Sequence, residues 1–203
     1  MRTVPENELV DCGSDTSPSL LDRVRANDDV AWRRFVRLYS PLVYTWAKRC
    51  GLKNQDAADV LQDVFHAVAR SLGQFRRDPA TGGFRGWLWV ITRNKVRDHY
   101  RARVAEPVGG TDMQQRLQEV PQVEPADWSE SGDCSRASLV SRATQIIRDD
   151  FEPHTWQAFW RLAVDNHPAK DIATDLGMTV DAVYQAKARV LKRLREELNG
   201  HVD

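Results

Sequence analysis

The stretch from Phe84 to Arg103 constrains the fold more than any other, because it reads as one continuous helix that needs a core to cover it. Successive residues of an α-helix advance by about 100° around its axis. One face of this helix therefore collects Leu88, Trp89, Thr92, Val96 and Tyr100. A face of this kind is buried against other helices, so the stretch predicts a helical domain built around it.

A second face of the same helix collects Trp87, Val90, Asn94, Arg97 and Arg101. It combines a flat aromatic ring, an amide and a row of guanidinium groups. Single-stranded nucleic acid binds to surfaces that offer both stacking and positive charge. A partly buried amphipathic helix with solvated arginines has the same pattern, so these residues alone leave both interpretations open.

The composition fits one large domain or two small ones, with 203 residues, 41% apolar residues and a net charge of zero. No apolar run approaches the roughly 20 residues that span a bilayer, so we expect no membrane insertion. Cys12, Cys50 and Cys134 lie far apart without a CxxC pair, which fits a reducing cytosol and predicts a cytoplasmic protein. The five histidines lack paired ligand spacing. We therefore expect no catalytic site, no bound metal and no cofactor.

Helical spacing of the apolar residues predicts an all-α chain, since strand-like alternation of useful length does not appear. Residues 1–18 are polar, lack the apolar core of an export signal and are predicted to be disordered. Residues 19–103 are predicted to form a first small helical domain. Within it, Pro41 is expected to mark a boundary and open a new helix. A further helix is expected over residues 56–72.

Residues 104–134 differ in composition from the domain before them, because prolines appear, apolar residues thin out and acidic residues outnumber basic ones. This composition predicts a flexible, acidic and mostly unstructured linker. Its negative charge also explains why a chain with a basic helix is neutral overall. A second small helical domain is predicted for residues 135–198, followed by a tail at residues 199–203.

The second domain contains a helix-turn-helix pattern between Pro168 and Leu198. Ala173 is small enough for two helices to cross closely, Gly177 tolerates the backbone of the turn, and Val183 returns to pack against the first helix. In such a unit the second helix enters the major groove of DNA with its N-terminal part. A plain helical hairpin with a solvated basic face is the alternative.

Both halves together resemble the bacterial sigma-70 family, in particular the small extracytoplasmic-function (ECF) group of RNA polymerase sigma factors. The run Asp56–Phe65, DAADVLQDVF, is similar to the family's D-A-E-D-hydrophobic-hydrophobic-Q-E-V-F signature in region 2. The helix-turn-helix resembles region 4. The stretch from Phe84 is similar to the following F-R-x-W-L…R-N-x-x-x-D-x-x-R-x-R pattern, with matches at Trp87, Leu88, Arg93, Asn94, Asp98, Arg101 and Arg103.

The resemblance implies a protein that binds core RNA polymerase and directs promoter recognition, DNA melting and transcription initiation. Core polymerase would be bound by Asp59, Gln62, Asp63 and Phe65. The melted −10 element of promoter DNA would be bound by Arg76, Arg77, Arg85, Trp87, Asn94, Arg97, Asp98 and Arg101. The duplex −35 element would be bound by Thr179, Tyr184, Gln185, Lys187, Arg189 and Lys192. An anti-sigma factor is a common regulatory partner in this family.

The chain departs from the family pattern at two places. Ala58 stands where the region 2 signature usually has Glu, and the run from Val183 to Leu191 replaces the commoner V-K-S-R-L-x-R-A-R, which shifts the cationic positions. A conventional helix-turn-helix regulator is the alternative, with residues 19–103 as a sensing or dimerising domain. It explains the C-terminal half equally well but gives no reason for the Trp–Asn–Arg face.

Overall fold

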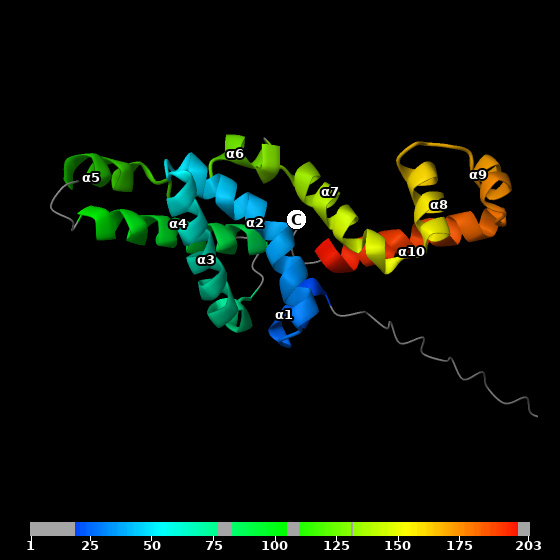
Figure 1. Cartoon of the computed structure of the whole chain (residues 1–203), viewed down its shortest axis with the longest axis horizontal. Helices are drawn as coiled ribbons and strands as arrows, with labels where there is room; N and C mark the ends of the chain where they lie inside the picture. Colours follow the sequence, from blue (N-terminus) through cyan, green and yellow to red (C-terminus); the bar gives the residue numbers. More distant parts are fainter. Residues whose placement is uncertain (1–18, 77–82, 105–109, 131, 199–203) are drawn as a thin grey trace, which may run out of the picture.

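The structure is a computed structural model that describes residues 19–76, 83–104, 110–130 and 132–198. Within these ranges every regular element is a helix and none is a strand (Figure 1). The prediction of an all-α fold is confirmed. The residues predicted to be disordered, 1–18, and the tail at 199–203 lie outside the described ranges.

The N-terminal unit consists of α1 (Leu20–Arg25), α2 (Asp29–Arg49), α3 (Asn54–Ser71), the short 3-10 turn η1 (Leu72–Gln74) and α4 (Gly83–Val104). Side chains of the preceding residues start the first two helices. Ser19 caps α1 in a capping box with Asp22, and the Asp28 carboxylate accepts hydrogen bonds from the amides of Val30 and Ala31. The four α-helices bury a shared core in which Phe35, Trp46 and Trp89 are among the largest side chains.

The predicted boundary at Pro41 is wrong, because α2 runs without interruption from Asp29 to Arg49. Proline lacks an amide hydrogen and so removes one helical hydrogen bond. Leu38 and Tyr39 before it, and Leu42 and Val43 after it, are all buried in the same core. Packing on both sides of the proline therefore keeps the two segments in one helix.

The segment predicted to be a mostly unstructured linker contains α5 (Gly110–Glu119), α6 (Ala126–Glu130) and the 3-10 turn η3 (Gly132–Cys134). Its sparse apolar residues pack against the N-terminal core, namely Met113, Leu117, Val120, Trp128 and Cys134. Figure 1 shows α5 beside α4, and η3 packs against α2. The acidic composition suggested a solvated chain, but a few well-placed apolar side chains are enough to dock these short helices.

The C-terminal unit consists of α7 (Arg136–Ile147), η4 (Arg148–Asp150), α8 (Pro153–Ala163), α9 (Ala169–Leu176) and α10 (Val180–Leu198). Helix α10 packs against α7, α8 and α9. One small apolar cluster joins Ala158, Ile172, Ala173 and Val183, and another joins Ile147, Phe159 and Val190. The sequence boundary drawn at residue 135 stays a prediction, because Leu139, Ala143 and Ile146 of α7 belong to the core of α1–α4.

Candidate nucleic-acid interface

The two faces predicted for the helix from Phe84 to Arg103 are both present in α4. Leu88, Trp89, Thr92, Val96 and Tyr100 are all buried, which confirms the core-facing side. On the other side Val90, Asn94, Asp98 and Arg101 are exposed, and Trp87 and Arg97 are partly buried. The helix thus presents an amide and guanidinium groups outward because its apolar stripe is fixed in the core.

The Trp87 ring is held in place by aromatic neighbours instead of projecting freely. Its centroid lies 5.0 Å from that of Phe75 and 5.4 Å from that of Phe84. Aromatic rings at such separations attract one another. Trp87 therefore offers only part of its ring to a ligand, and that part has a fixed orientation next to the η1 turn.

The charged groups of this face have few competing partners. Arg101 and Asp98 form an exposed ion pair of 3.4 Å, of the kind that contributes at most about 1 kcal/mol. The buried Nε of Arg97 has no acceptor within the described ranges. The Arg101 guanidinium is thus accessible to a phosphate or a base without breaking a strong contact, whereas Arg97 is partly buried and its Nε is out of reach of a ligand.

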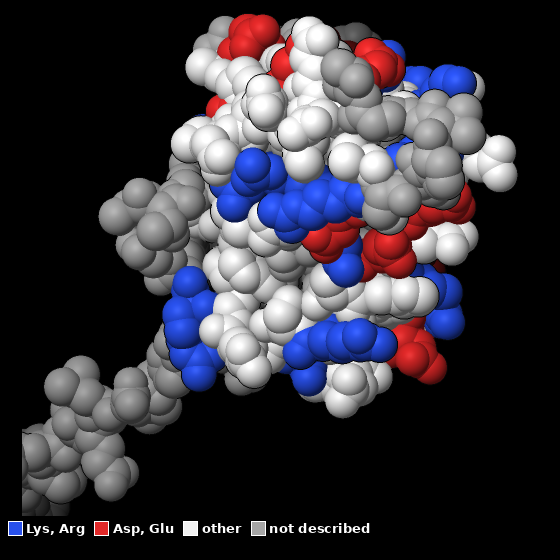
Figure 2. Space-filling view, turned by 90° about the vertical axis from the view of Figure 1, so that its left-hand side faces the viewer, with Lys and Arg blue, Asp and Glu red and all other residues white. Residues whose placement is uncertain are grey.

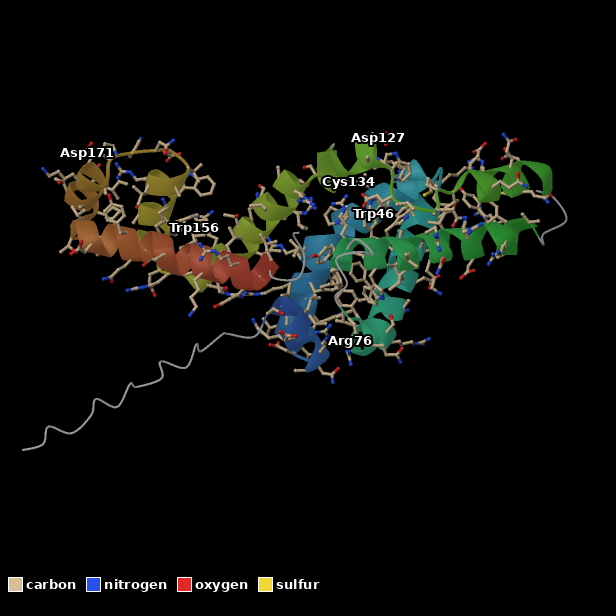
Figure 3. The ribbon with its side chains drawn as sticks, turned by 180° about the vertical axis from the view of Figure 1, so that it is seen from behind. Trp46, Arg76, Asp127, Cys134, Trp156 and Asp171 are labelled. Carbon is tan, nitrogen blue, oxygen red and sulfur yellow. The ribbon has the colours of Figure 1, made fainter. Side chains whose placement is uncertain are left out.

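Arg85 does not lie on the exposed face of α4, although the resemblance grouped it with the residues that bind the −10 element. Its guanidinium forms two hydrogen bonds with the Glu124 carboxylate, donates to the Cys134 carbonyl at 2.7 Å and lies over the Trp46 ring. Trp46 Nε1 donates to the same carboxylate at 2.8 Å. Figure 3 labels Trp46 and Cys134 at the centre of the molecule. Arg85 in this structure joins α4 to the segment before α6 and is not part of the exposed face.

The loop before α4 is only partly described. Arg76 is exposed at the edge of the N-terminal unit, next to the end of η1 (Figure 3). Arg77 lies outside the described residues. Figure 2 looks onto the end of the molecule at which α4 ends and α5 begins, and it shows groups of Lys and Arg side chains separated by Asp and Glu. The basic surface there is therefore divided and not one continuous patch.

Helix α3 presents three of the four residues that the resemblance assigns to core polymerase on its exposed side. Asp59, Gln62 and Asp63 are all exposed, because the buried side of the helix carries Ala57, Val60, Val64 and Val68. Phe65 is different, since it is only 7% exposed and its ring packs edge-on against Trp32 and Phe35. Phe65 was grouped with the stripe by resemblance, but it belongs to the core and offers no surface to a partner.

The helix-turn-helix geometry is confirmed in detail. Gly177 ends α9 with a φ of 63°, a left-handed conformation that favours glycine, and Ala173 and Val183 are buried in one cluster. Thr179 Oγ1 accepts a hydrogen bond from the amide of Ala182 and so starts α10. Thr179 has this structural role in addition to its predicted contact with DNA.

The outward side of α10 carries the other residues predicted to read DNA. Tyr184, Gln185, Arg189 and Lys192 are exposed, whereas Lys187 is partly buried. The Gln185 side chain accepts a weak hydrogen bond of 3.3 Å from Arg189, one turn further on. Gln and Arg side chains exposed on such a helix can bond to base edges, and Lys to phosphates.

Two contacts that the sequence did not predict fix α4 relative to its neighbours. Buried Asp56, the first residue of the region 2 signature, pairs with Arg103 at 2.8 Å and lies 3.7 Å from His99. Arg93 donates to the carbonyl and the side chain of Gln122. Helical spacing predicts which residues share a face of one helix, but it cannot predict pairs of residues that lie 29 or 47 positions apart.

Among the residues that the structure describes, no three His, Cys, Asp or Glu side chains are grouped as metal ligands would be. Burial raises the pKa of the Cys50 thiol to about 12, so its reactive thiolate is scarce at neutral pH. No helix in the described ranges is long and apolar enough to cross a bilayer.

The fold and the exposed side chains define a class of protein: an all-helical DNA-binding protein with a helix-turn-helix and a separate aromatic, amide and guanidinium face. Comparison with known families makes this class specific. The family model for sigma-70 region 2 matches residues 35–106, which include α3 and α4.

Curated relatives extend the match to most of the chain. The RNA polymerase sigma-H factor of Pseudomonas aeruginosa is 27% identical over 87% of this chain and 92% of its own length. The ECF RNA polymerase sigma factor SigE of Mycolicibacterium smegmatis is 26% identical over 84% of this chain and 63% of its own length. A solved structure titled "Structure of CnrH in complex with the cytosolic domain of CnrY" is 21% identical over 90% of this chain and 97% of its own, with a TM-score of 0.35.

The family model over α3 and α4 and the curated relatives together support an RNA polymerase sigma factor of the ECF, sigma-70 type. As such it acts in transcription initiation.

Proposed function

We propose that this sigma factor divides its work among three surfaces: the acidic stripe of α3 binds core RNA polymerase, the exposed face of α4 binds the melted −10 element, and α10 reads the duplex −35 element. The single observation that carries the proposal is the pair of faces on α4. One is fully buried, and the other holds Asn94, Arg97 and Arg101 outward beside the edge of Trp87.

The chemistry of α4 suits DNA whose strands have separated. The exposed part of the Trp87 ring can contact an unpaired base, Asn94 can bond to the edge of that base, and Arg97 and Arg101 can neutralise phosphates. A duplex offers no free base face for stacking, so the aromatic contact is made only as the strands open. Binding energy from that contact therefore favours the melted state over the closed one.

The α10 surface suits intact duplex instead. Gln185 lies in the N-terminal half of the helix, which is the part that reaches base edges in helix-turn-helix proteins, and Arg189 and Lys192 follow toward its C-terminus. Few cations lie near the start of the helix, so we propose that −35 binding depends on Gln185 and Tyr184 as well as on phosphate contacts. The partners are core RNA polymerase and promoter DNA, which places the protein in the cytoplasm.

The proposal that α3 binds core RNA polymerase rests on the charge of its exposed side chains. Asp59, Gln62 and Asp63 form an exposed carboxylate and amide stripe, which can accept charge-assisted hydrogen bonds from arginines on a partner. Phe65 is left out of this surface because it is buried.

Asp59→Lys is expected to weaken binding to core polymerase by roughly tenfold, because it turns an attractive charge into a repulsive one at an interface. The measurement is an equilibrium titration of labelled sigma factor with purified core enzyme at two salt concentrations. Asp29→Lys makes the same change of charge at an exposed position of α2 and serves as the control. Equal affinities of wild type and Asp59→Lys for core polymerase would show that this side of α3 does not contact the polymerase.

A further inference from the structure

Arg93 of α4 lies beside the exposed face of that helix but belongs to none of the three proposed binding surfaces. Its side chain is partly buried. Its Nη1 donates hydrogen bonds to the Gln122 carbonyl oxygen at 2.7 Å and to Gln122 Oε1 at 3.0 Å. Its Nη2 donates to Asn94 Oδ1 at 3.3 Å. One guanidinium group therefore connects Asn94 with a residue of the segment between α5 and α6.

The segment that carries Gln122 is anchored on both sides of that residue. Val120 is only 4% exposed and belongs to the N-terminal core. Glu124 accepts a hydrogen bond of 2.8 Å from Arg85 Nε of α4. Because the chain is attached just before and just after Gln122, its carbonyl oxygen has a fixed place beside α4. A fixed acceptor of this kind can hold a guanidinium group in one orientation.

The orientation matters for Asn94, because the two ends of its amide differ chemically. The side-chain oxygen only accepts hydrogen bonds, and the side-chain nitrogen only donates them. Since Oδ1 lies toward Arg93, the nitrogen is the end that is left for a ligand. Asn94 is exposed, so this nitrogen can reach the edge of a base. A fixed amide distinguishes a base that presents an acceptor at this point from one that presents a donor, whereas a freely rotating amide pairs with either.

A direct contact between Arg93 and a phosphate is the competing interpretation. Two observations favour a positioning role. Nη1 of Arg93 is already engaged by two oxygens of Gln122, and Nε is buried without an acceptor in the described part of the chain. A phosphate would have to displace the first contact and could not reach the second atom. The guanidinium of Arg101, in contrast, is exposed on the same helix.

We propose that Arg93 is a positioning residue for the −10 contact: held by Gln122, it turns the Asn94 amide so that its nitrogen faces outward and donates to an acceptor on an unpaired base. Asn94 then selects among bases at one position of the −10 element, and the segment between α5 and α6 takes part in that selection. The inference rests on the proposed role of α4 in binding the melted −10 element. The orientation of the amide is a property of the free chain and does not depend on that role.

The orientation is tested first in the free protein, by NMR relaxation of the Asn94 side-chain amide, which reports its mobility on the picosecond to nanosecond timescale. Arg93→Lys keeps the positive charge but lacks the planar fork that reaches two partners. Gln122→Ala removes one of the two acceptors, and Gln118→Ala removes another exposed amide, on α5, as the matched control. We expect a restricted amide in wild type and in Gln118→Ala, a mobile one in Arg93→Lys and an intermediate one in Gln122→Ala.

A mobile Asn94 amide in wild type, or one that stays equally restricted in Arg93→Lys, would overturn the orienting contact. Circular dichroism of each variant checks that the helix content is unchanged. Gln122→Ala that behaves as Gln118→Ala does would show that the segment between α5 and α6 takes no part.

The second measurement is initiation by core polymerase with each variant on a library of promoters randomised across the −10 element. We expect Asn94→Ala to lose its base preference at one position. Arg93→Lys should weaken the preference at that same position by roughly three- to tenfold, the effect of losing one hydrogen bond. A merely structural defect would instead lower initiation from every sequence alike. Arg93→Lys combined with Asn94→Ala should be no worse than Asn94→Ala alone, because Arg93 acts through Asn94.

The possible failures are distinguishable. If Arg93→Lys keeps the preference that Asn94→Ala loses, or if the losses of the two variants add, Arg93 does not position Asn94 and the proposed function still stands. If Asn94→Ala keeps every preference of the wild type, the proposed −10 contact itself is wrong, and the relaxation result still decides whether Arg93 orients the amide.

Discussion

Glu124→Ala is expected to destabilise the protein by about 2–3 kcal/mol, because it removes one partner of a partly buried, hydrogen-bonded ion pair and leaves the other behind. The side chains of Arg85 and Glu124 are only 18% and 11% exposed, so solvent cannot replace the lost carboxylate easily. Trp46 Nε1 loses its acceptor in the same substitution. The variant therefore combines an uncompensated guanidinium with an unsatisfied buried donor.

Equilibrium unfolding in urea, followed by circular dichroism, measures this effect. Val123→Ala is the control, since Val123 is 76% exposed next to Glu124, and its truncation should change the free energy of unfolding by less than about 0.5 kcal/mol. Glu124→Gln keeps an acceptor for Trp46 Nε1, so its free energy of unfolding should lie between those of Val123→Ala and Glu124→Ala. A loss below about 1 kcal/mol for Glu124→Ala would show that this segment is not docked on α4 in solution.

Asn94→Ala is expected to slow the formation of stable open complexes by roughly tenfold or more, while core binding and protein stability stay as in wild type. A side chain that bonds to the edge of an unpaired base contributes about 1–3 kcal/mol. Asn94 is exposed and accepts only a long hydrogen bond of 3.3 Å from Arg93, so its removal leaves the core intact. Trp87 is a less clean target because it packs on Phe75 and Phe84.

The measurement is the rate of −10 strand opening, followed with a fluorescent base analogue in the non-template strand. Gln145→Ala removes an exposed helical amide from α7 and serves as the control. Reduced affinity for core polymerase in Asn94→Ala, with normal opening once bound, would place Asn94 at the protein interface and not at the DNA.

The spacing of apolar residues along the sequence predicted those parts of the fold in which the burial of a residue depends only on its position within its own helix. The buried and exposed faces of α4 and the Ala173, Gly177 and Val183 positions of the helix-turn-helix are examples, because each depends on spacing of a few residues.

Positions that depend on distant parts of the chain were not predictable in this way. Pro41 was predicted to be a helix boundary, because the sequence does not show that the residues on both of its sides pack into one core. Arg85 reads as one more cation of a basic helix, but its partner Glu124 lies 39 positions away in a segment that composition describes as solvated. Phe65 was grouped by resemblance with the exposed residues Asp59, Gln62 and Asp63, and only the positions of Trp32 and Phe35 show that it is core. Arg34 of α2 is hydrogen-bonded to Asp150, which lies 116 positions further along the chain.

The proposed function is tested most directly by transcription with purified core RNA polymerase and this protein. The templates are promoter fragments found by mapping transcription starts after overexpression of the protein. We expect the protein to bind core polymerase and to direct initiation from promoters that core alone ignores, with shared −10 and −35 motifs upstream of the mapped starts. Failure to bind core polymerase or to direct initiation, together with tight binding to a duplex operator without polymerase, would contradict the account and identify a conventional helix-turn-helix regulator.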